Sequence, residues 1–227
     1  MKRIRFSYKI TMDGVKIIAF IMITSVYAPL LLGEEKVEIG LFSKSDLTGW
    51  KIKEFKNQTR YSLVTEDGKS VLKAESSETA SAFYKEIKID LTKTPILNWT
   101  WKIENILSNP DEQVKAGDDF PARIYLVFDS GIKVWRTKAL NYVWSSNNLI
   151  GSSWPNPFSS NVIMKVLRSG EKHINTWISE KRNVRKDLVD LYGKDVKSID
   201  GIAIMTDTDN SSGKATAYYG DIYFSQN

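Results

Sequence analysis

The sequence contains no cysteine and only one histidine among its 227 residues. The lack of cysteine excludes disulfide bonds, thiolate metal sites, a cysteine nucleophile and a lipid-modified cysteine. The one histidine, His173, falls in a predicted turn. Zinc sites built from several histidines are therefore excluded, and a Ser-His-Asp triad is a poor fit. No glycine-rich phosphate loop follows a predicted strand. Several common kinds of enzyme site are thus ruled out.

The net positive charge is also small once the N-terminus is set aside. The formal net charge is +5, but residues 1–28 hold five basic residues and one acidic residue, which leaves 27 basic and 26 acidic residues for the rest. A nearly neutral body gives no support for a phosphate-binding surface. We therefore expect no nucleic-acid partner.

The first 33 residues have the pattern of an export segment. A basic stretch ending at Lys16 precedes an apolar run over 17–28, which is the length of a signal-peptide core. Pro29 disfavours cleavage directly before it, and the uncharged run continues to position 33, about the shortest length that crosses a bilayer. We predict that residues 1–33 are a signal peptide or an N-terminal membrane anchor. A membrane is then contacted only through an uncleaved segment, and residues 34–227 lie outside the cytoplasm, in the periplasm or secreted.

The rest of the chain has the pattern of an all-β domain. Short β-rich runs are separated by Gly, Asn, Asp and Ser, and seven Trp, ten Tyr and nine Phe suit strands. One helix of any length is expected, over 184–192, with Gly193 as its stop. We predict a single antiparallel two-sheet sandwich over 34–227 with that one short helix. Its expected strands are 37–42, 50–55, 60–65, 70–75, 82–89, 96–103, 122–128, 133–143, 162–167, 176–180, 199–206 and 215–224.

A group of charged residues introduces the predicted strand 122–128. Asp118 and Asp119 precede it, and Arg123 begins a strand face that also carries Tyr125. Carboxylates beside a cation can orient a polar ligand, so these four residues are candidate ligand-binding residues. The alternative is structural: the aspartates cap backbone amides and Arg123 forms an internal ion pair.

A second acidic group offers oxygen ligands near the C-terminus. Asp207 and Asp209 would hold calcium together with Asp221 if the last strand returned beside their loop. The alternative is an ordinary hairpin turn, because the run DTDNSSG is rich in turn formers.

Aromatic residues gather in the middle of the chain, at Trp135, Tyr142, Trp144 and Trp154. Exposed rings stack on the apolar faces of sugars, so Tyr142 and Trp144 are candidate ligand-binding residues. The alternative is that these rings belong to the core of the sandwich.

Several runs of the chain together resemble a bacterial family, the domain of unknown function DUF3047. They are AGDDFPARIYLVFD at 116–129, LNYVWSS at 140–146, WISEKRNV at 177–184, YG at 192–193, and IAIMTDTDNS with YYGDIYF. The resemblance covers about 41–224 and implies a usually exported protein with a jelly-roll-like sandwich of the kind seen in carbohydrate-binding modules. It implies no established activity.

We therefore expect an extracytoplasmic binding module for a glycan or another polar ligand. Its partner would be a polysaccharide or another component of the cell envelope, and calcium is the one candidate cofactor. The first alternative is a carbohydrate-active enzyme, a glycoside hydrolase or polysaccharide lyase on a jelly-roll scaffold, which would need two carboxylates across a groove. The second is a purely structural or protein-interaction domain.

Overall fold

The computed structural model describes residues 35–108, 111–129 and 138–227. The predictions made for the leader at 1–33, for Trp135 and for the start of the strand at 133–143 lie outside these residues. Within the described ranges, no helix combines the length and the apolar character needed to cross a membrane.

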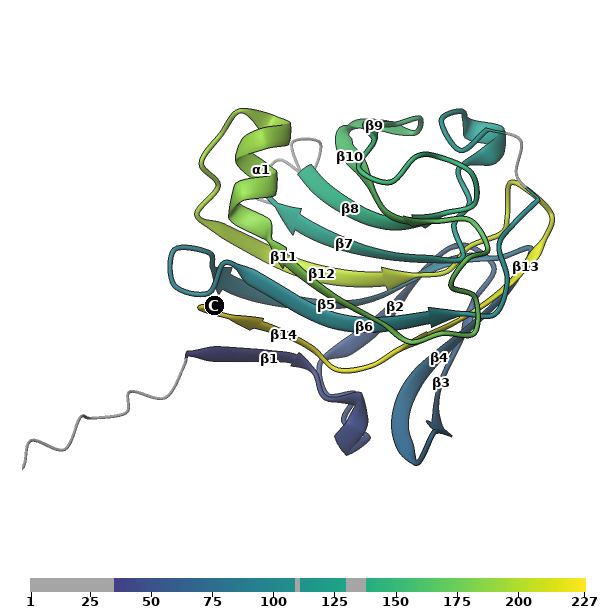
Figure 1. Cartoon of the computed structure of the whole chain (residues 1–227), viewed down its shortest axis with the longest axis horizontal. Helices are drawn as coiled ribbons and strands as arrows, with labels where there is room; N and C mark the ends of the chain where they lie inside the picture. Colours follow the sequence, from purple (N-terminus) through teal and green to yellow (C-terminus); the bar gives the residue numbers. More distant parts are fainter. Residues whose placement is uncertain (1–34, 109–110, 130–137) are drawn as a thin grey trace, which may run out of the picture. The chain divides into compact units, whose positions relative to one another are not determined.

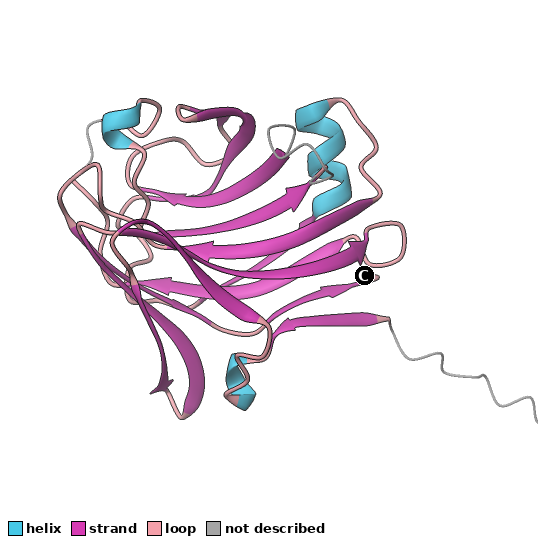
Figure 2. Ribbon diagram, turned by 180° about the vertical axis from the view of Figure 1, so that it is seen from behind, coloured by secondary structure: helices cyan, strands magenta, loops and turns pink. Residues whose placement is uncertain are grey.

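Fourteen strands among the described residues form two seven-stranded sheets that face each other (Figures 1 and 2). All described strand pairs are antiparallel except β8 with β10. The first sheet contains β1 (Lys36–Gly40), β3 (Arg60–Glu66), β4 (Lys69–Ser77), β6 (Ile96–Ile103), β11 (Ile178–Asn183), β13 (Lys214–Tyr219) and β14 (Ile222–Ser225). The second contains β2 (Trp50–Lys56), β5 (Ala80–Asp90), β7 (Ala122–Phe128), β8 (Lys138–Ser145), β9 (Ser153–Asn156), β10 (Ser159–Ser169) and β12 (Ser198–Met205). The predicted all-β sandwich is confirmed.

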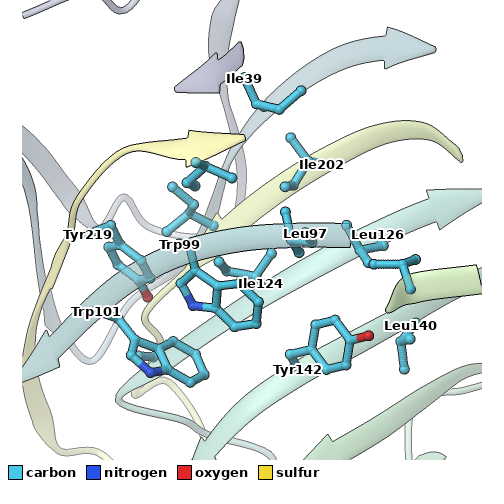
Figure 3. Packing of buried hydrophobic residues seen from close by; sticks show 14 of the residues in the cluster. Ile39, Leu97, Trp99, Trp101, Ile124, Leu126, Leu140, Tyr142, Ile202 and Tyr219 are labelled. Atoms are coloured by element: carbon cyan, nitrogen blue, oxygen red, sulfur yellow. The ribbon is translucent and has the colours of Figure 1, made fainter. Parts of the chain in front are cut away.

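The core lies between the two sheets and is rich in aromatic rings (Figure 3). Alternate residues of β6 point into it, so Trp99 and Trp101 are buried. Their rings meet those of Tyr142 and Trp144 on β8, with centroids 5.7 and 5.8 Å apart. Because inward positions of β6 are filled by the core, its outward positions are left for solvent or a ligand.

One α-helix, α1 (Val184–Tyr192), covers an edge of the sandwich (Figure 1). The Asn183 side chain caps its first turn, and Gly193 ends it in the left-handed conformation at φ 64°. Tyr142 donates a hydrogen bond of 2.6 Å to Asp187 and so ties the helix to the core. The helix has the predicted bounds and the predicted stop.

The predicted strand 215–224 is in fact two strands, and the first sheet forks between them. Along one side of β6, β13 leads on to β4 and β3, whereas β14 leads on to β1. The break falls at Gly220, whose N–H donates to the Thr100 carbonyl at 3.0 Å. A side chain at Gly220 would collide with the Thr100 hydroxyl, so the close approach of β6 requires glycine here. Strand β9 was not predicted either, because its run SWPN contains a proline.

Candidate functional site

The charged group predicted from the sequence is buried. Arg123 is 2% exposed, its Nη2 donates to Asp207, and its Nη1 lies 3.8 Å from Asp118 Oδ1. The guanidinium also lies over the ring of half-buried Tyr125, at 5.3 Å from its centroid. Asp118 and Asp119 are buried as well. The structure thus shows the internal ion pair of the structural alternative, and the buried side chains of Asp118, Asp119 and Arg123 are not open to a ligand.

Asp119 joins this group to the loop that follows β12. Its carboxylate accepts hydrogen bonds from the backbone N–H groups of Asn210 and Ser211. One carboxylate oxygen from each of Asp119, Asp207 and Asp209 lies within 4.8 Å of the others. We call these three residues, with Asp118 and Arg123, the charged cluster.

The predicted calcium ligands are divided by the structure. Asp207 and Asp209 come together, but Asp221 lies elsewhere and accepts hydrogen bonds of 2.8 and 2.5 Å from the Ser43 N–H and hydroxyl. Asp119 takes the place predicted for Asp221. Calcium binding at the cluster stays a prediction, and a calcium-dependent rise in melting temperature would support it.

Burial governs the protonation of the charged cluster. It raises the pKa of Asp207 well above the ordinary range, although Arg123 acts in the opposite direction. Burial is also the largest cause of the raised pKa of Asp118 and of Asp209. Several carboxylates therefore share one guanidinium in a poorly solvated place, which is costly unless protons are retained.

The predicted aromatic platform is part of the interior. Tyr142 and Trp144 are completely buried in the main core, and Trp154 packs in a second small cluster with Phe120 and Val143. The alternative that assigned these rings to the core is therefore the correct one for all three, and none of them is available to stack on a sugar.

An open site lies instead on the outer face of the first sheet. It is a groove of about 930 Å³ whose floor includes Asn98 and Thr100 of β6 and Gly220 at the fork. The turn between β3 and β4 and Ser43 of the 3-10 turn η1 (Phe42–Lys44) form its walls. Figures 1 and 2 show η1 and the β3–β4 hairpin projecting on the same side of the sheet. We call this site the outer groove.

Two half-buried aromatic residues line the outer groove at separate places. Trp177 precedes β11, with its ring centroid 6.4 Å from that of Tyr218 and 5.5 Å from Lys102 Nζ. Tyr223 lies on β14, with Lys36 Nζ 3.8 Å from its ring centroid. Rings flanked by amides, hydroxyls and charged groups suit a ligand that has both apolar faces and many hydroxyls.

Most acidic side chains of the outer groove already have partners. Glu66 is ion-paired with Lys102, and Asp221 accepts hydrogen bonds from the N–H and hydroxyl of Ser43. Glu180 accepts a hydrogen bond of 2.6 Å from Arg168 and one of 3.2 Å from Trp101 Nε1. The Glu66 and Asp221 carboxylates brace the groove, whereas the Glu180 carboxylate, which bonds inward-pointing Trp101, lies on the core side of the sheet.

Neither Trp177 nor Tyr223 was predicted as a site residue. Strand alternation is a signal that could have found Tyr223, because its neighbours Ile222 and Phe224 are both apolar and face the core. Trp177 gives no comparable local signal. Its place beside β6 depends on the pairing of Ile178 with Trp101, far apart in the sequence.

Comparisons with known proteins agree with the fold. A family model described as "Protein of unknown function (DUF3047)" matches residues 48–223. A search of curated proteins found no match. Among solved structures, the family 30 carbohydrate-binding module of a cellulosomal cellulase from Clostridium thermocellum is 13% identical, with 84% of this chain and 96% of that chain covered and a TM-score of 0.51.

Two glycoside hydrolases also match, with lower structural similarity. A cellulase derived from Cel12A of Rhodothermus marinus is 9% identical, with 83% of this chain and all of that chain covered and a TM-score of 0.46. The glycoside hydrolase domain of Endo-D from Streptococcus pneumoniae is 11% identical with a TM-score of 0.39, and 78% of this chain spans 22% of its length. At such identities the carbohydrate-binding module shows a shared fold, and the two hydrolases add nothing about the site.

Proposed function

The chain belongs to the DUF3047 family, and we propose that it is a non-catalytic binding module for a glycan, which it holds in the outer groove. The observation that carries this proposal is the half-buried ring of Trp177 within a groove of about 930 Å³. Ligand pockets of a few hundred to about 1,000 Å³ are typical for small molecules and short oligomers.

The composition of the groove supports a sugar ligand. A pyranose ring presents C–H groups on its faces and hydroxyls at its rim, so it needs a flat apolar partner and several hydrogen-bonding groups. Trp177 provides the first, and Asn98, Thr100 and Ser179 provide the second. The carbohydrate-binding module with a similar fold makes this use of a sandwich plausible on general grounds, as an analogy.

Binding is favoured over hydrolysis by the state of the groove's acids. A glycosidase needs one carboxyl free to protonate the leaving group and a second free to attack or to activate water. Among the described lining residues of the outer groove, Glu66 and Asp221 are each held by a neighbouring donor or cation and Glu180 is buried against Arg168, which leaves Asp67 as a single carboxyl and not the required pair. We therefore propose no cleavage, and incubation with polysaccharide should release no reducing ends.

We propose further that the module works outside the cytoplasm, on a cell-envelope or extracellular polysaccharide. The support is the basic and apolar pattern of residues 1–33. Expression with the native leader followed by cell fractionation tests this proposal, and recovery of the protein solely in the cytoplasmic fraction would reject it.

The test of the proposed function is a binding measurement on the purified protein against isolated cell-envelope polysaccharides and a glycan array. Trp177→Ala should weaken binding by about tenfold or more, because it removes the stacking surface. Phe158→Ala is the matched control, since Phe158 is 57% exposed and does not line the groove. Failure of the wild-type protein to bind any glycan, or equal losses in the two variants, would reject the outer groove as a glycan site.

A further inference from the structure

We infer that the outer groove binds an uncharged linear oligosaccharide over several sugar units, with one contact ring at Trp177 and a second at Tyr223. This inference rests on the proposed function and specifies its ligand. It depends on the separation of the two rings, on the low floor between them and on the mixture of charges around them.

The strand register separates the two rings. Tyr223 on β14 lies opposite Asn98 of β6. On the other side of β6, Ile178 of β11 lies opposite Trp101, so the preceding residue, Trp177, lies beside Lys102. The two positions differ by four residues along β6 and by two strand spacings across the sheet. At about 3.4 Å per residue and about 4.8 Å per spacing, this corresponds to roughly 17 Å. A monosaccharide is much smaller and cannot touch both rings.

The two rings belong to the same outer face. Asn98 and Lys102 alternate with the inward-pointing Trp99 and Trp101, so both point away from the core. Their cross-strand partners therefore point outward too, and both Trp177 and Tyr223 line the outer groove. An extended ligand can contact the two rings without entering the protein.

The floor between the rings is low. Thr100 sits against Gly220, where no side chain rises from the sheet. Asn98 keeps its amide close to the sheet by donating to Ser225 Oγ at 2.9 Å. A chain of sugar rings can therefore lie across this stretch and form hydrogen bonds with the floor while its ends stack on the aromatic residues.

Both aromatic rings are held in place before any ligand arrives. Trp177 is flanked by Tyr218 and by the ammonium group of Lys102, which is itself ion-paired with Glu66. Tyr223 is flanked by the ammonium group of Lys36. Cation–π contacts of this kind restrict ring orientation, which lowers the entropic cost of binding.

The charges around the groove favour an uncharged chain. Glu66 and Glu180 are neutralised by ion pairs with Lys102 and Arg168, and the other charged lining residues, acidic Asp67 and Asp221 and basic Lys69 and Lys181, are equal in number, so neither sign dominates. A polyanionic chain of uronates would meet the carboxylates, and a polycationic chain would meet the ammonium groups. A neutral chain avoids both repulsions.

The experiment measures affinity against chain length for the full-length protein. The probes are uncharged gluco-, xylo-, manno- and galacto-oligosaccharides of one to six units, with galacturonate oligomers of equal length as the charged series. For the preferred sugar, affinity should rise with length until both rings are covered and then level off, and the charged series should bind at least tenfold more weakly.

Tyr223→Leu locates the second contact. This variant keeps an apolar side chain beside Lys36 and removes the ring, and its fold is checked by its melting temperature. It should remove the gain between short and long chains while leaving the affinity for the shortest bound chain unchanged. Trp177→Ala should weaken all lengths.

Other outcomes would contradict the inference, and they distinguish failure of the extended uncharged ligand from failure of glycan binding itself. Affinity that does not depend on length, a loss in Tyr223→Leu that is equal for short and long chains, or a preference for the galacturonate series would overturn the extended uncharged ligand and leave glycan binding intact. Absence of binding to every oligosaccharide, charged and uncharged, would overturn the proposed function as well.

Discussion

The two outer faces of the sandwich both carry charged and aromatic side chains, but these are covered by other parts of the chain on the second sheet and accessible on the first. On the second sheet, Arg123 points away from the main core, yet the residues before β7 and after β12 cover it and its aspartate partners. On the first sheet, Trp177 and Tyr223 are only partly buried and line an open groove. A concentration of charge in the sequence therefore does not mark a binding site. Whether such residues can bind a ligand depends on whether another segment of the chain covers that face of the sheet.

Because of this difference, removing a side chain should affect the free energy of unfolding differently at the two sites. In the charged cluster, Arg123 offsets the negative charge of buried carboxylates although its Nε and Nη1 lack hydrogen-bond partners among the described residues, so removing it leaves those carboxylates buried without a cation. In the outer groove, most polar groups contact water, so removing one costs little stability and changes the contacts offered to a ligand.

The largest effect is expected for Arg123→Met, which keeps the length of the side chain and removes its charge. Buried Asp207 and Asp118 would lose their cation, so the free energy of unfolding should fall by about 3–5 kcal/mol. Urea denaturation measures this change. Lys181→Met removes a cation from the exposed rim of the outer groove and should change stability by no more than about 0.5 kcal/mol. Similar midpoints for the two variants would mean that the cluster is in contact with water.

An intermediate loss of stability is expected for a substitution at Gly220, where the first sheet forks. Gly220→Ala places a methyl group against the Thr100 hydroxyl and should cost about 1–3 kcal/mol through overpacking. Thr100→Ala removes that hydroxyl, so the double variant should recover most of the loss in a thermodynamic cycle. A double variant as unstable as Gly220→Ala alone would show that the cost arises from the backbone and not from this contact.

The local part of the fold could be predicted from the sequence. Strands β6 and β7 and helix α1 have their predicted bounds, because alternation, capping and the stop at Gly193 are encoded within each segment. The division between β13 and β14 could not be predicted in this way. The run YYGDIYF continues to alternate, and only the contact between Gly220 and Thr100 on another strand reveals the break.

The sites depended on contacts between distant parts of the chain. Whether Arg123 faces solvent or an ion pair is decided by Asp207, which is 84 residues away. The sequence left both alternatives open for that reason. Trp177 becomes a groove residue through the pairing of β11 with β6, and no local pattern encodes that pairing.

A smaller effect on the free energy of unfolding is expected when pH is varied. Its sign is opposite to that of ordinary acid denaturation, because the charged cluster should become less stabilising as pH rises. Because burial raises the pKa of Asp118, Asp207 and Asp209, the folded protein retains protons that the unfolded chain releases above about pH 4. Between that pH and the raised pKa values, these groups make the free energy of unfolding decrease as pH rises. The unfolding midpoint in urea should therefore fall as pH rises from about 5 toward these raised pKa values.

Asp118→Asn tests this assignment, because it removes one of the titrating groups. Asp118 Oδ1 has no hydrogen-bond partner within the described part of the chain, so the amide should fit without breaking an existing bond there. Stability should then depend less steeply on pH in the variant than in the wild type. Exposed carboxylates such as Asp195, whose pKa is lowered by its hydrogen bond with Arg185, contribute equally to both proteins and cancel. Parallel pH profiles would contradict the assignment.

A smaller loss of stability than for a core tryptophan is expected for Trp177→Ala, although it removes a large ring from the outer groove. In the main core, truncating a tryptophan to alanine costs about 3–5 kcal/mol, because the loss of buried area leaves a cavity. Trp177 is only partly buried, and its ring contacts Tyr218 and the Lys102 ammonium group. Contacts of this kind contribute about 0.5–1 kcal/mol at exposed sites. With the loss of its partial burial added, the free energy of unfolding should fall by about 1–2 kcal/mol, while the affinity for the glycan falls by about tenfold or more. Trp177→Phe should recover part of the affinity, because it restores a flat ring, and should leave stability near that of the wild type. A loss of several kcal/mol in Trp177→Ala would instead make this residue part of the core, and the two outer faces would then no longer differ in the way the exposed groove implies.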